Sequence, residues 1–289
     1  MFDDISEFVS TYNLGSFNEP ESVKSYVDYF GLEQLLASMD CNDDSIDSQE
    51  KDLGSHLFEI VPTEYKPFEP KYDDLVRLHC LILKRKVLTT LEFGSGYSTA
   101  IMAHAKSILS DNFINDVGQF RVDVPFHVYA VEEDQRFLDV TQDRLKKSEL
   151  ESYATISRSS VDMILHDNRV ASVYSRLPNI SPDFIYLDGP SQYATTTDIN
   201  GINFNSPCRM PMSADILRFE FFLEPGTLIV VDGRTANARF LRSYLKRNWD
   251  YVHDPVGDVH YFELVESPLG KHNKAKIDFC LGSSFYGKN

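Results

Sequence analysis

Residues 87–103 read VLTTLEFGSGYSTAIMA, and this stretch decides the fold class. An apolar run ends in Glu92, two glycines follow at Gly94 and Gly96, and the next residues favour a helix. A strand that passes into a helix through a glycine turn lets a ligand approach the backbone closely. Such a turn can hold a dinucleotide, a nucleoside or a phosphate, or it can merely change the direction of the chain.

Short apolar runs alternate with helical patterns from residue 87 to residue 249. The expected strands are 87–93, 127–132, 153–157, 183–188 and 227–232. The expected helices are 98–109, 134–148, 160–170, 213–223 and 236–249. Apolar strands that alternate with helices predict a parallel sheet covered on both faces, and residues 251–266 add a hairpin. The predicted fold class is α/β, with a doubly wound, mostly parallel, seven-stranded Rossmann-like sheet that ends in an antiparallel hairpin.

The acidic residues are concentrated in the first quarter of the chain. The net charge is −16, and residues 1–74 hold 18 Asp and Glu against 4 Lys and Arg, whereas residues 75–289 hold 26 against 24. Residues 1–74 are therefore predicted to form an acidic, mainly helical extension or cap with a linker, including a helix over 20–39. Residues 75–270 form the predicted main domain, and residues 271–289 form a C-terminal tail.

Composition and charge limit the possible partners. No apolar run approaches the roughly 20 residues that cross a bilayer, so we expect no membrane span. The chain lacks a cationic surface for a phosphate backbone, so we expect no nucleic-acid partner. The four cysteines form no CxxC pair, which fits a reducing compartment, and we expect a cytoplasmic protein. The helix over 20–39 can mediate association, so a homo-oligomer is an open alternative.

The residues around the glycine turn bear on the ligand. Thr99 stands where a dinucleotide-binding turn carries its third glycine, and Glu92 places a carboxylate where a pyrophosphate would lie. A carboxylate there suits a ligand with a cationic group, such as the ammonium of an amino acid. Glu132 ends the second strand, where it can accept hydrogen bonds from both hydroxyls of a ribose or remain a solvated charge.

The segments LEFGSGYS, VYAVEED, FIYLDG and EPGTLIVVDG resemble, in this order, the motifs of class I S-adenosylmethionine-dependent methyltransferases. The resemblance covers about residues 85–265. It implies the following cofactor contacts: Glu92, Gly94, Gly96, Tyr97 and Ser98 at the methionine moiety, Glu132 at the ribose, and Ser160 near the adenine. Glu133 follows Glu132 directly and is expected to be exposed, with its neighbourhood able to flank the adenine. Ser159 and Asp162 remain alternatives to Ser160 at the adenine.

Two aspartates lie where the acceptor is expected. Asp188 ends the fourth strand and Asp232 the fifth, so they can bind a divalent cation such as Mg²⁺ through hard oxygen atoms. Metal-dependent catechol-type O-methyltransferases resemble this arrangement, but they carry Asn where this chain has Gly233. Without a metal, Asp188 contacts the cofactor or acts as general base. A third interpretation is that both aspartates only cap the helices that follow.

The connection over residues 189–212 is long enough for a lid or binding loop. Tyr193 and Arg209 in this loop, with Arg234 after the fifth strand, are the candidate substrate-binding residues. The other arginines of the 236–249 helix are expected on its solvated face: Arg239, Arg242 and Arg247. His253 and His260, near the final hairpin, are either general bases or ordinary structural histidines.

These observations predict a methyltransferase that uses S-adenosylmethionine and methylates a small polar acceptor, at oxygen, with a sugar or glycan precursor as one such acceptor. A catalytically inactive methyltransferase-like module that binds or scaffolds a partner is the second interpretation. An NAD-dependent dehydrogenase is the third, and Glu92 and Thr99 argue against it.

Overall fold

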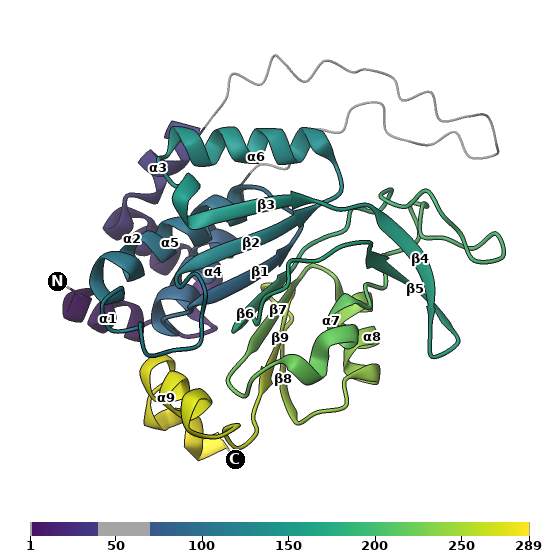
Figure 1. Ribbon diagram of the computed structural model, residues 1–289. Coiled ribbons are helices and arrows are strands. Elements are labelled where there is room, and N and C mark those ends of the chain that lie inside the picture. Colours follow the sequence, from purple (N-terminus) through teal and green to yellow (C-terminus); the bar gives the residue numbers. More distant parts are fainter. Residues whose placement is uncertain (1, 40–69, 289) are drawn as a thin grey trace.

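The computed structural model describes residues 2–39 and 70–288, and one seven-stranded sheet forms its centre (Figure 1). The strands are β1 (Thr89–Phe93), β2 (His127–Glu132), β3 (Ala154–Arg158), β6 (Phe184–Leu187), β7 (Leu228–Asp232), β8 (Trp249–Asp254) and β9 (Val259–Leu264). Their order is β3-β2-β1-β6-β7-β9-β8, in which the first five are parallel and β9 is antiparallel to both neighbours. The predicted fold class is confirmed.

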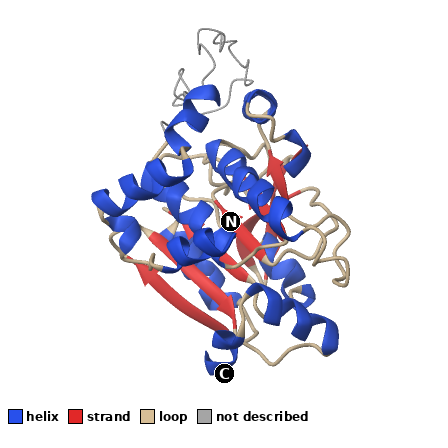
Figure 2. Ribbon diagram, turned by 90° about the vertical axis from the view of Figure 1, so that its left-hand side faces the viewer, coloured by secondary structure: helices blue, strands red, loops and turns tan. Residues whose placement is uncertain are grey.

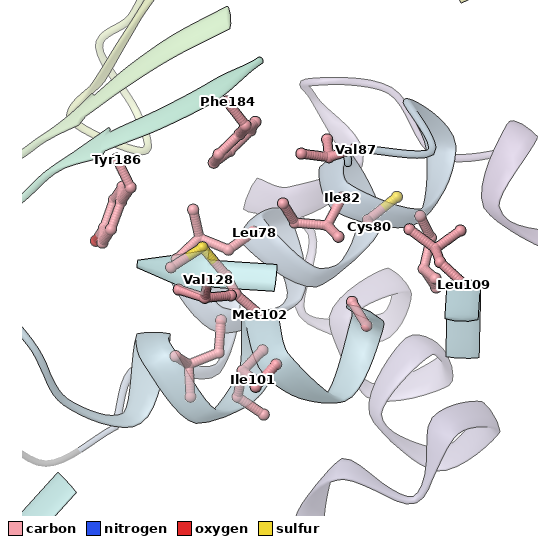
Figure 3. Packing of buried hydrophobic residues seen from close by; sticks show 14 of the residues in the cluster. Leu78, Cys80, Ile82, Val87, Ile101, Met102, Leu109, Val128, Phe184 and Tyr186 are labelled. Atoms are coloured by element: carbon pink, nitrogen blue, oxygen red, sulfur yellow. The ribbon is translucent and has the colours of Figure 1, made fainter. Parts of the chain in front are cut away.

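The helices form layers on the two faces of the sheet (Figures 1 and 2). The main helices are α4 (Tyr72–Lys84), α5 (Tyr97–Phe113), α6 (Gln135–Lys147), α7 (Asp215–Phe219) and α8 (Thr235–Tyr244). Leu78 and Ile82 of α4 pack with Met102 of α5 against Val128 and Phe184 of the sheet (Figure 3). A second apolar cluster joins α7 and α8 to the opposite face. The strand order reverses between β1 and β6, so the carboxyl ends of these strands mark the expected ligand site.

The N-terminal helices pack on α4 rather than standing apart. They are α1 (Phe2–Ser10), α2 (Pro20–Phe30) and α3 (Leu32–Met39), and their buried side chains belong to the same core as α4 and α5. The helix expected over 20–39 is divided at Gly31, whose φ of 63° is left-handed and ends α2. The expected linker over 40–69 lies outside the described residues, and the predicted boundary at residue 74 falls inside α4. No helix in the described parts of the chain combines the length and the apolar character that a bilayer crossing requires.

The helix expected over 160–170 is wrong. Residues there form an antiparallel hairpin of β4 (Val161–His166) and β5 (Arg169–Tyr174). Asp167 and Asn168 form its two-residue turn with φ values of 46° and 60°. Asp and Asn tolerate this left-handed region, and two such residues make the turn that matches the twist of a hairpin. The hairpin follows β3 and extends beyond the main sheet (Figure 1).

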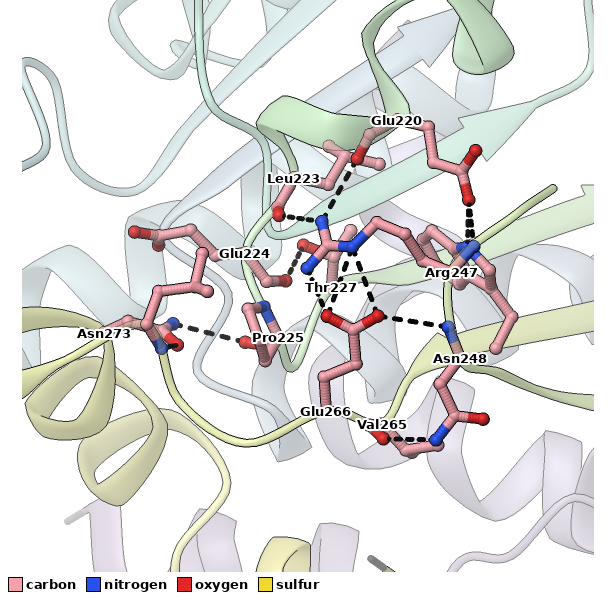
Figure 4. Close-up of polar contacts among 12 residues, drawn as sticks. Glu220, Leu223, Glu224, Pro225, Thr227, Arg247, Asn248, Val265, Glu266 and Asn273 are labelled. Atoms are coloured by element: carbon pink, nitrogen blue, oxygen red, sulfur yellow. Dashed lines mark hydrogen bonds and ion pairs between the residues drawn. The ribbon is translucent and has the colours of Figure 1, made fainter.

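Arg247 does not lie on a solvated helix face, because α8 already ends at Tyr244. The Arg247 side chain is 8% exposed, and its Nη2 lies 2.6 Å from Glu266 Oε2 (Figure 4). The expected C-terminal tail is also ordered: residues Lys271–Cys280 form α9, with Ile277 and Cys280 buried.

Candidate functional site

Glu92 is the buried centre of the turn between β1 and α5. Its Oε1 accepts a hydrogen bond from Ser98 Oγ at 2.5 Å, and its Oε2 accepts one from Thr99 Oγ1 at 2.6 Å. Thr99 Oγ1 also accepts a hydrogen bond from Gly96 N at 3.1 Å. Burial raises the pKa of Glu92 to about 8, while the two hydroxyl donors oppose that shift. Thr99 occupies the position of the third glycine of a dinucleotide-binding turn, and here its hydroxyl connects the Glu92 carboxylate to the glycine turn.

The two residues that begin α5 have their side chains engaged. The Ser98 hydroxyl is bonded to Glu92, and the guanidinium carbon of Arg144 in α6 lies 3.7 Å from the centre of the Tyr97 ring. A cation over an aromatic face is a favourable contact, and here it holds the ring between α5 and α6. Both side chains thus have partners within the protein, and the contacts of Tyr97 and Ser98 with a cofactor stay a prediction.

Glycines close the turn on one side and leave it open on the other. Gly94 has a φ of +99°, and a Cβ added at Gly189 would lie 2.6 Å from both Gly94 N and the Tyr174 hydroxyl. The ends of β1 and β6 thus meet backbone to backbone. A Cβ added at Gly96 would meet no heavy atom of the described residues within 4 Å. The backbone at Gly96 is therefore open to a ligand.

Glu132 at the end of β2 is bound to the same turn. Its Oε2 accepts a hydrogen bond from Ser95 Oγ at 2.8 Å, and its Oε1 accepts one from Asp134 N at 3.0 Å. Burial, followed by the charge of Glu133, raises the pKa of Glu132 to about 8. Each carboxylate oxygen has two acceptor sites, so both retain capacity for a further donor.

Glu133 connects two segments instead of projecting into solvent. Its Oε2 accepts a hydrogen bond from the Tyr174 hydroxyl at 3.0 Å, and its Oε1 accepts one from Ser191 N at 2.7 Å. The residue therefore joins the end of β5 to the start of the 189–212 loop, next to Glu132.

The serines before β4 lie beside this edge. Ser159 N donates to the Glu132 carbonyl at 2.9 Å, which continues the pairing of β2 with β3. Ser159 is buried and its Oγ accepts a hydrogen bond from Arg176 N at 2.9 Å, whereas Ser160 is exposed and its Oγ donates to Ser175 Oγ at 2.9 Å. Of the two serines, Ser160 is the one that a ligand can reach.

Asp232 at the end of β7 is part of a group of carboxylates. Its Oδ2 accepts a hydrogen bond from the Tyr186 hydroxyl at 3.0 Å. Burial, followed by the charges of Asp74 and Asp188, raises the pKa of Asp232 to about 7. Asp74 belongs to α4, so the helix before the sheet contributes a carboxylate that the sequence pattern did not indicate.

Arg77 accompanies Asp74 on α4 and is 1% exposed. Its Nη1 forms an ion pair with Asp74 Oδ1. Its Nη2 packs so closely against the turn between β8 and β9 that a Cβ added at Gly257 would lie 2.6 Å away. Nε and Nη2 have no hydrogen-bond partner among the described residues. Arg77 therefore places a buried positive charge close to the carboxylates of Asp74 and Asp232.

Arg234 is bound to the protein backbone. It donates from Nη1 to the Pro190 carbonyl at 2.9 Å and from Nη2 to the Asp188 carbonyl. Its Nε lies 3.7 Å from Asp188 Oδ1, and its side chain is 11% exposed against 54% for Asp188. Arg234 thus holds the loop after β6 in place, and Asp188 is the more accessible group.

The 189–212 loop is fastened to the β4–β5 hairpin. Met163 N donates to Thr197 Oγ1 at 2.8 Å, and Gln192 Nε2 donates to the Arg209 carbonyl at 2.6 Å. The Arg209 guanidinium donates from Nη1 to the Asn203 carbonyl at 2.8 Å, and Tyr193 is half-buried. The loop therefore has its own hydrogen-bonded structure at the edge of the site.

The chain is similar to several solved structures, each at low sequence identity. No family model and no curated protein matches the sequence. The O-methyltransferase from Bacillus cereus in complex with SAH is 12% identical, with 91% of this chain and 100% of that chain covered and a TM-score of 0.37. Cofactor-bound Rv0187 from MTB is 12% identical, with 86% and 99% covered and a TM-score of 0.41. The O-methyltransferase TomG from Streptomyces achromogenes, involved in tomaymycin synthesis and in complex with SAM, is 14% identical, with 68% and 81% covered and a TM-score of 0.38.

The conclusion on the fold rests on the strand order. The order in which the five parallel strands are added to the sheet reverses between β1 and β6. Strand β9 lies between β7 and β8 and is antiparallel to both. The chain has the fold of class I methyltransferases. In this methyltransferase fold, the predicted residues Glu92, Glu132 and Asp188 all lie at the carboxyl edge of the sheet, as the sequence resemblance implied.

The donor set at Asp188 and Asp232 does not complete a magnesium site. Hard cations take six or more oxygen ligands, so two carboxylates supply only part of such a site. Within the described residues, neither aspartate belongs to a group of three side-chain ligands close enough to share an ion. Asp188 is paired with Arg234, and Asp232 is bound by Tyr186. No step is therefore assigned to a metal at this edge of the methyltransferase fold.

Proposed function

We propose that the protein is an S-adenosylmethionine-dependent methyltransferase that methylates a small polar acceptor at oxygen. One contact supports this most directly: Ser95 holds the carboxylate of Glu132 beside a glycine turn that is open at Gly96. A buried carboxylate with free acceptor capacity suits the paired hydroxyls of a ribose, and the open backbone suits the amino acid end of the same ligand.

In this proposal the cofactor lies along the ends of β1, β2 and the β4–β5 hairpin. Bound S-adenosylmethionine supplies an electrophilic methyl group on a sulfonium. Glu132 accepts the ribose hydroxyls, the Gly94–Gly96 turn contacts the methionine part, and Glu133 and Ser160 border the adenine. Glu92 acts by positioning, because both of its oxygens are already bonded to Ser98 and Thr99.

The acceptor lies on the side of Asp188 and Asp232. A group accepts a proton most effectively when its pKa is near the working pH, and burial raises the pKa of Asp232 to about 7. Asp232 thus suits the removal of a proton from an acceptor hydroxyl, while the exposed Asp188 orients that acceptor. Tyr193 and Arg209 border it from the loop, and Arg234 fixes the loop. Carboxylates that accept hydrogen bonds suit a hydroxyl-rich acceptor such as a sugar or glycan precursor.

Isothermal titration tests the cofactor assignment. Wild-type protein is titrated with S-adenosylmethionine and with its demethylated product, and Glu132→Ala and Asp139→Asn are titrated in parallel. Asp139 is an exposed residue of α6 close in sequence to Glu132 and serves as the matched control. We expect Glu132→Ala to weaken binding about 10- to 100-fold, because one or two hydrogen bonds to the ribose hydroxyls are lost. Asp139→Asn should bind as the wild type does.

The absence of binding by wild-type protein at millimolar cofactor would refute the proposal. Binding of NAD in place of S-adenosylmethionine would favour the dehydrogenase. Cofactor binding without methyl transfer to any of a panel of hydroxylated acceptors would favour the inactive binding module, which keeps the cofactor edge but not the acceptor chemistry.

A further inference from the structure

The last hairpin of the sheet brings together two histidines and an aspartate. His253 of β8 and His260 of β9 are directly opposite each other, and their rings stack with centroids 4.1 Å apart at 10°. Asp258 lies in the connecting turn. One ligand atom from each of these three side chains lies within 4.8 Å of the other two, and no other such group of three occurs among the described residues.

The surroundings of His260 orient its ring as in a metal site. Its Nδ1 lies 2.9 Å from the Tyr251 hydroxyl, and its Nε2 lies 3.0 Å from Thr235 Oγ1. Thr235 Oγ1 also donates to Asp258 Oδ1 at 3.2 Å. A metal-bound histidine commonly has its second nitrogen held by a polar partner, which fixes the ring. Tyr251 supplies that partner, and Nε2 is left facing the carboxylate and the threonine hydroxyl.

The charges of the group fit a cation. His260 is 1% exposed, so its ring nitrogens are surrounded by protein groups rather than by water. Asp258 supplies a negative charge, and Arg239 is the nearby positive charge that opposes it.

This group is separate from the acidic group at Asp232. His260 pairs with Val231 and Val259 pairs with Asp232, and successive side chains along a strand point to opposite faces. His260 therefore lies on the same face of the sheet as Phe262 and the second apolar cluster, which joins α7 and α8 to the sheet. Asp232 lies on the opposite face, which α4 covers. Helix α8 and the β8–β9 hairpin lie on the same side of the molecule (Figure 1).

We propose that His253, Asp258 and His260 bind a divalent transition-metal ion of the zinc class, with Thr235 beside it as a further oxygen ligand. Zinc takes imidazole nitrogen at about 2.0–2.1 Å and carboxylate oxygen at about 2.0–2.2 Å, so the ligand atoms must draw together. His253 and Asp258 are exposed and free to make this adjustment. The ion fastens the hairpin to the first turn of α8, which begins at Thr235, and does not depend on the proposed methyl transfer.

Titration of the untagged full-length protein with Zn²⁺, and with Co²⁺ followed by its visible absorption, tests this site. We expect one ion per chain and a Co²⁺ spectrum of a mixed nitrogen and oxygen site. His253→Ala and Asp258→Asn, both changes of exposed side chains, should each weaken binding at least 10-fold. His272→Ala changes an exposed histidine of α9 and is the matched control, so it should bind as the wild type does.

A thermal shift separates this site from incidental binding elsewhere. Zn²⁺ should raise the Tm of wild type and of His272→Ala, but not of His253→Ala, because only a ligand of the native state stabilises it. Wild-type protein that binds no Zn²⁺ at 100 µM would overturn the proposal. Equal binding by wild type, His253→Ala and Asp258→Asn would also overturn it, and would assign the ion to other residues.

Discussion

The hydroxyl of Thr99 makes two hydrogen bonds. It donates to the buried Glu92 at 2.6 Å and accepts from Gly96 N at 3.1 Å. A hydroxyl is both a donor and an acceptor, so an apolar side chain of the same shape loses both functions. The residue thus determines whether the glycine turn and the carboxylate beneath it keep their relative positions.

Replacement of Thr99 by Val should lower the free energy of unfolding by about 1–3 kcal/mol, because it leaves a buried carboxylate oxygen short of a donor. Urea unfolding measures this change. Thr196→Val, at an exposed position of the 189–212 loop, is the matched control and should change stability by less than about 0.5 kcal/mol. If the two variants were equally stable, the hydroxyl bridge would have no role in the turn.

At the scale of elements, a cluster around Arg247 joins the end of α8 to two neighbouring segments (Figure 4). Arg247 Nη2 binds Glu266 Oε2 at 2.6 Å, and Nη1 donates to the Leu223 carbonyl at 2.5 Å. Glu220 Oε1 accepts from Arg247 N at 2.9 Å and from Trp249 Nε1 at 2.8 Å. These contacts set the path by which the chain leaves α8 and enters β8.

Arg247→Ala should lower the free energy of unfolding by about 2–4 kcal/mol, since it removes the guanidinium donors to the Leu223 carbonyl and to Glu266, which keeps the hydrogen bond from Asn248 N. Arg247→Lys should recover part of the loss, because a lysine keeps the charge but not the fork of donors. Arg239→Ala, at an exposed position of α8, is the comparison for denaturant unfolding. A cost for Arg247→Ala no larger than for Arg239→Ala would contradict the structure of this cluster.

At the scale of the whole molecule, a chain of buried polar groups joins the N-terminal helices to the sheet domain. The Tyr26 hydroxyl of α2 lies 2.9 Å from His79 Nδ1 of α4, and His79 Nε2 lies 3.0 Å from His104 Nδ1 of α5. Burial lowers the pKa of both histidines, that of His104 to about 4. The extension is therefore part of the same folded unit, held by groups that must stay neutral.

This chain of groups predicts a pH dependence. Between pH 6.5 and 4, an unfolded histidine binds a proton that folded His104 does not, so stability is fully present above pH 6.5 and is lost as the pH falls toward 4. His104→Asn keeps a polar atom near Nδ1 but does not titrate. Relative to this variant, wild type should lose up to about 3 kcal/mol over this range, measured by urea unfolding at each pH. Parallel pH profiles for the two proteins would show that His104 is not held neutral.

Patterns along the chain were sufficient for the strands and for part of the site. Apolar runs predicted each of the five parallel strands to within two residues, and the strand ends placed Glu92, Glu132, Asp188 and Asp232 at one edge of the sheet. The β4–β5 hairpin was missed because Val161–His166 has apolar residues that also suit a helix. The turn residues Asp167 and Asn168 were the signal that should have decided it.

The sequence by itself determined the order of strands and helices, because side-chain periodicity and turn residues are local properties. It also determined which carboxylates end the strands. Only the tertiary structure decided which side chains contact one another. Asp74 lies near Asp232, Arg234 donates hydrogen bonds to backbone carbonyls, and His253 lies opposite His260. These encounters join residues far apart in the chain or across a hairpin. Their distances follow from how the helices pack on the sheet and from which strands become neighbours, and neither can be read from a short stretch of the chain.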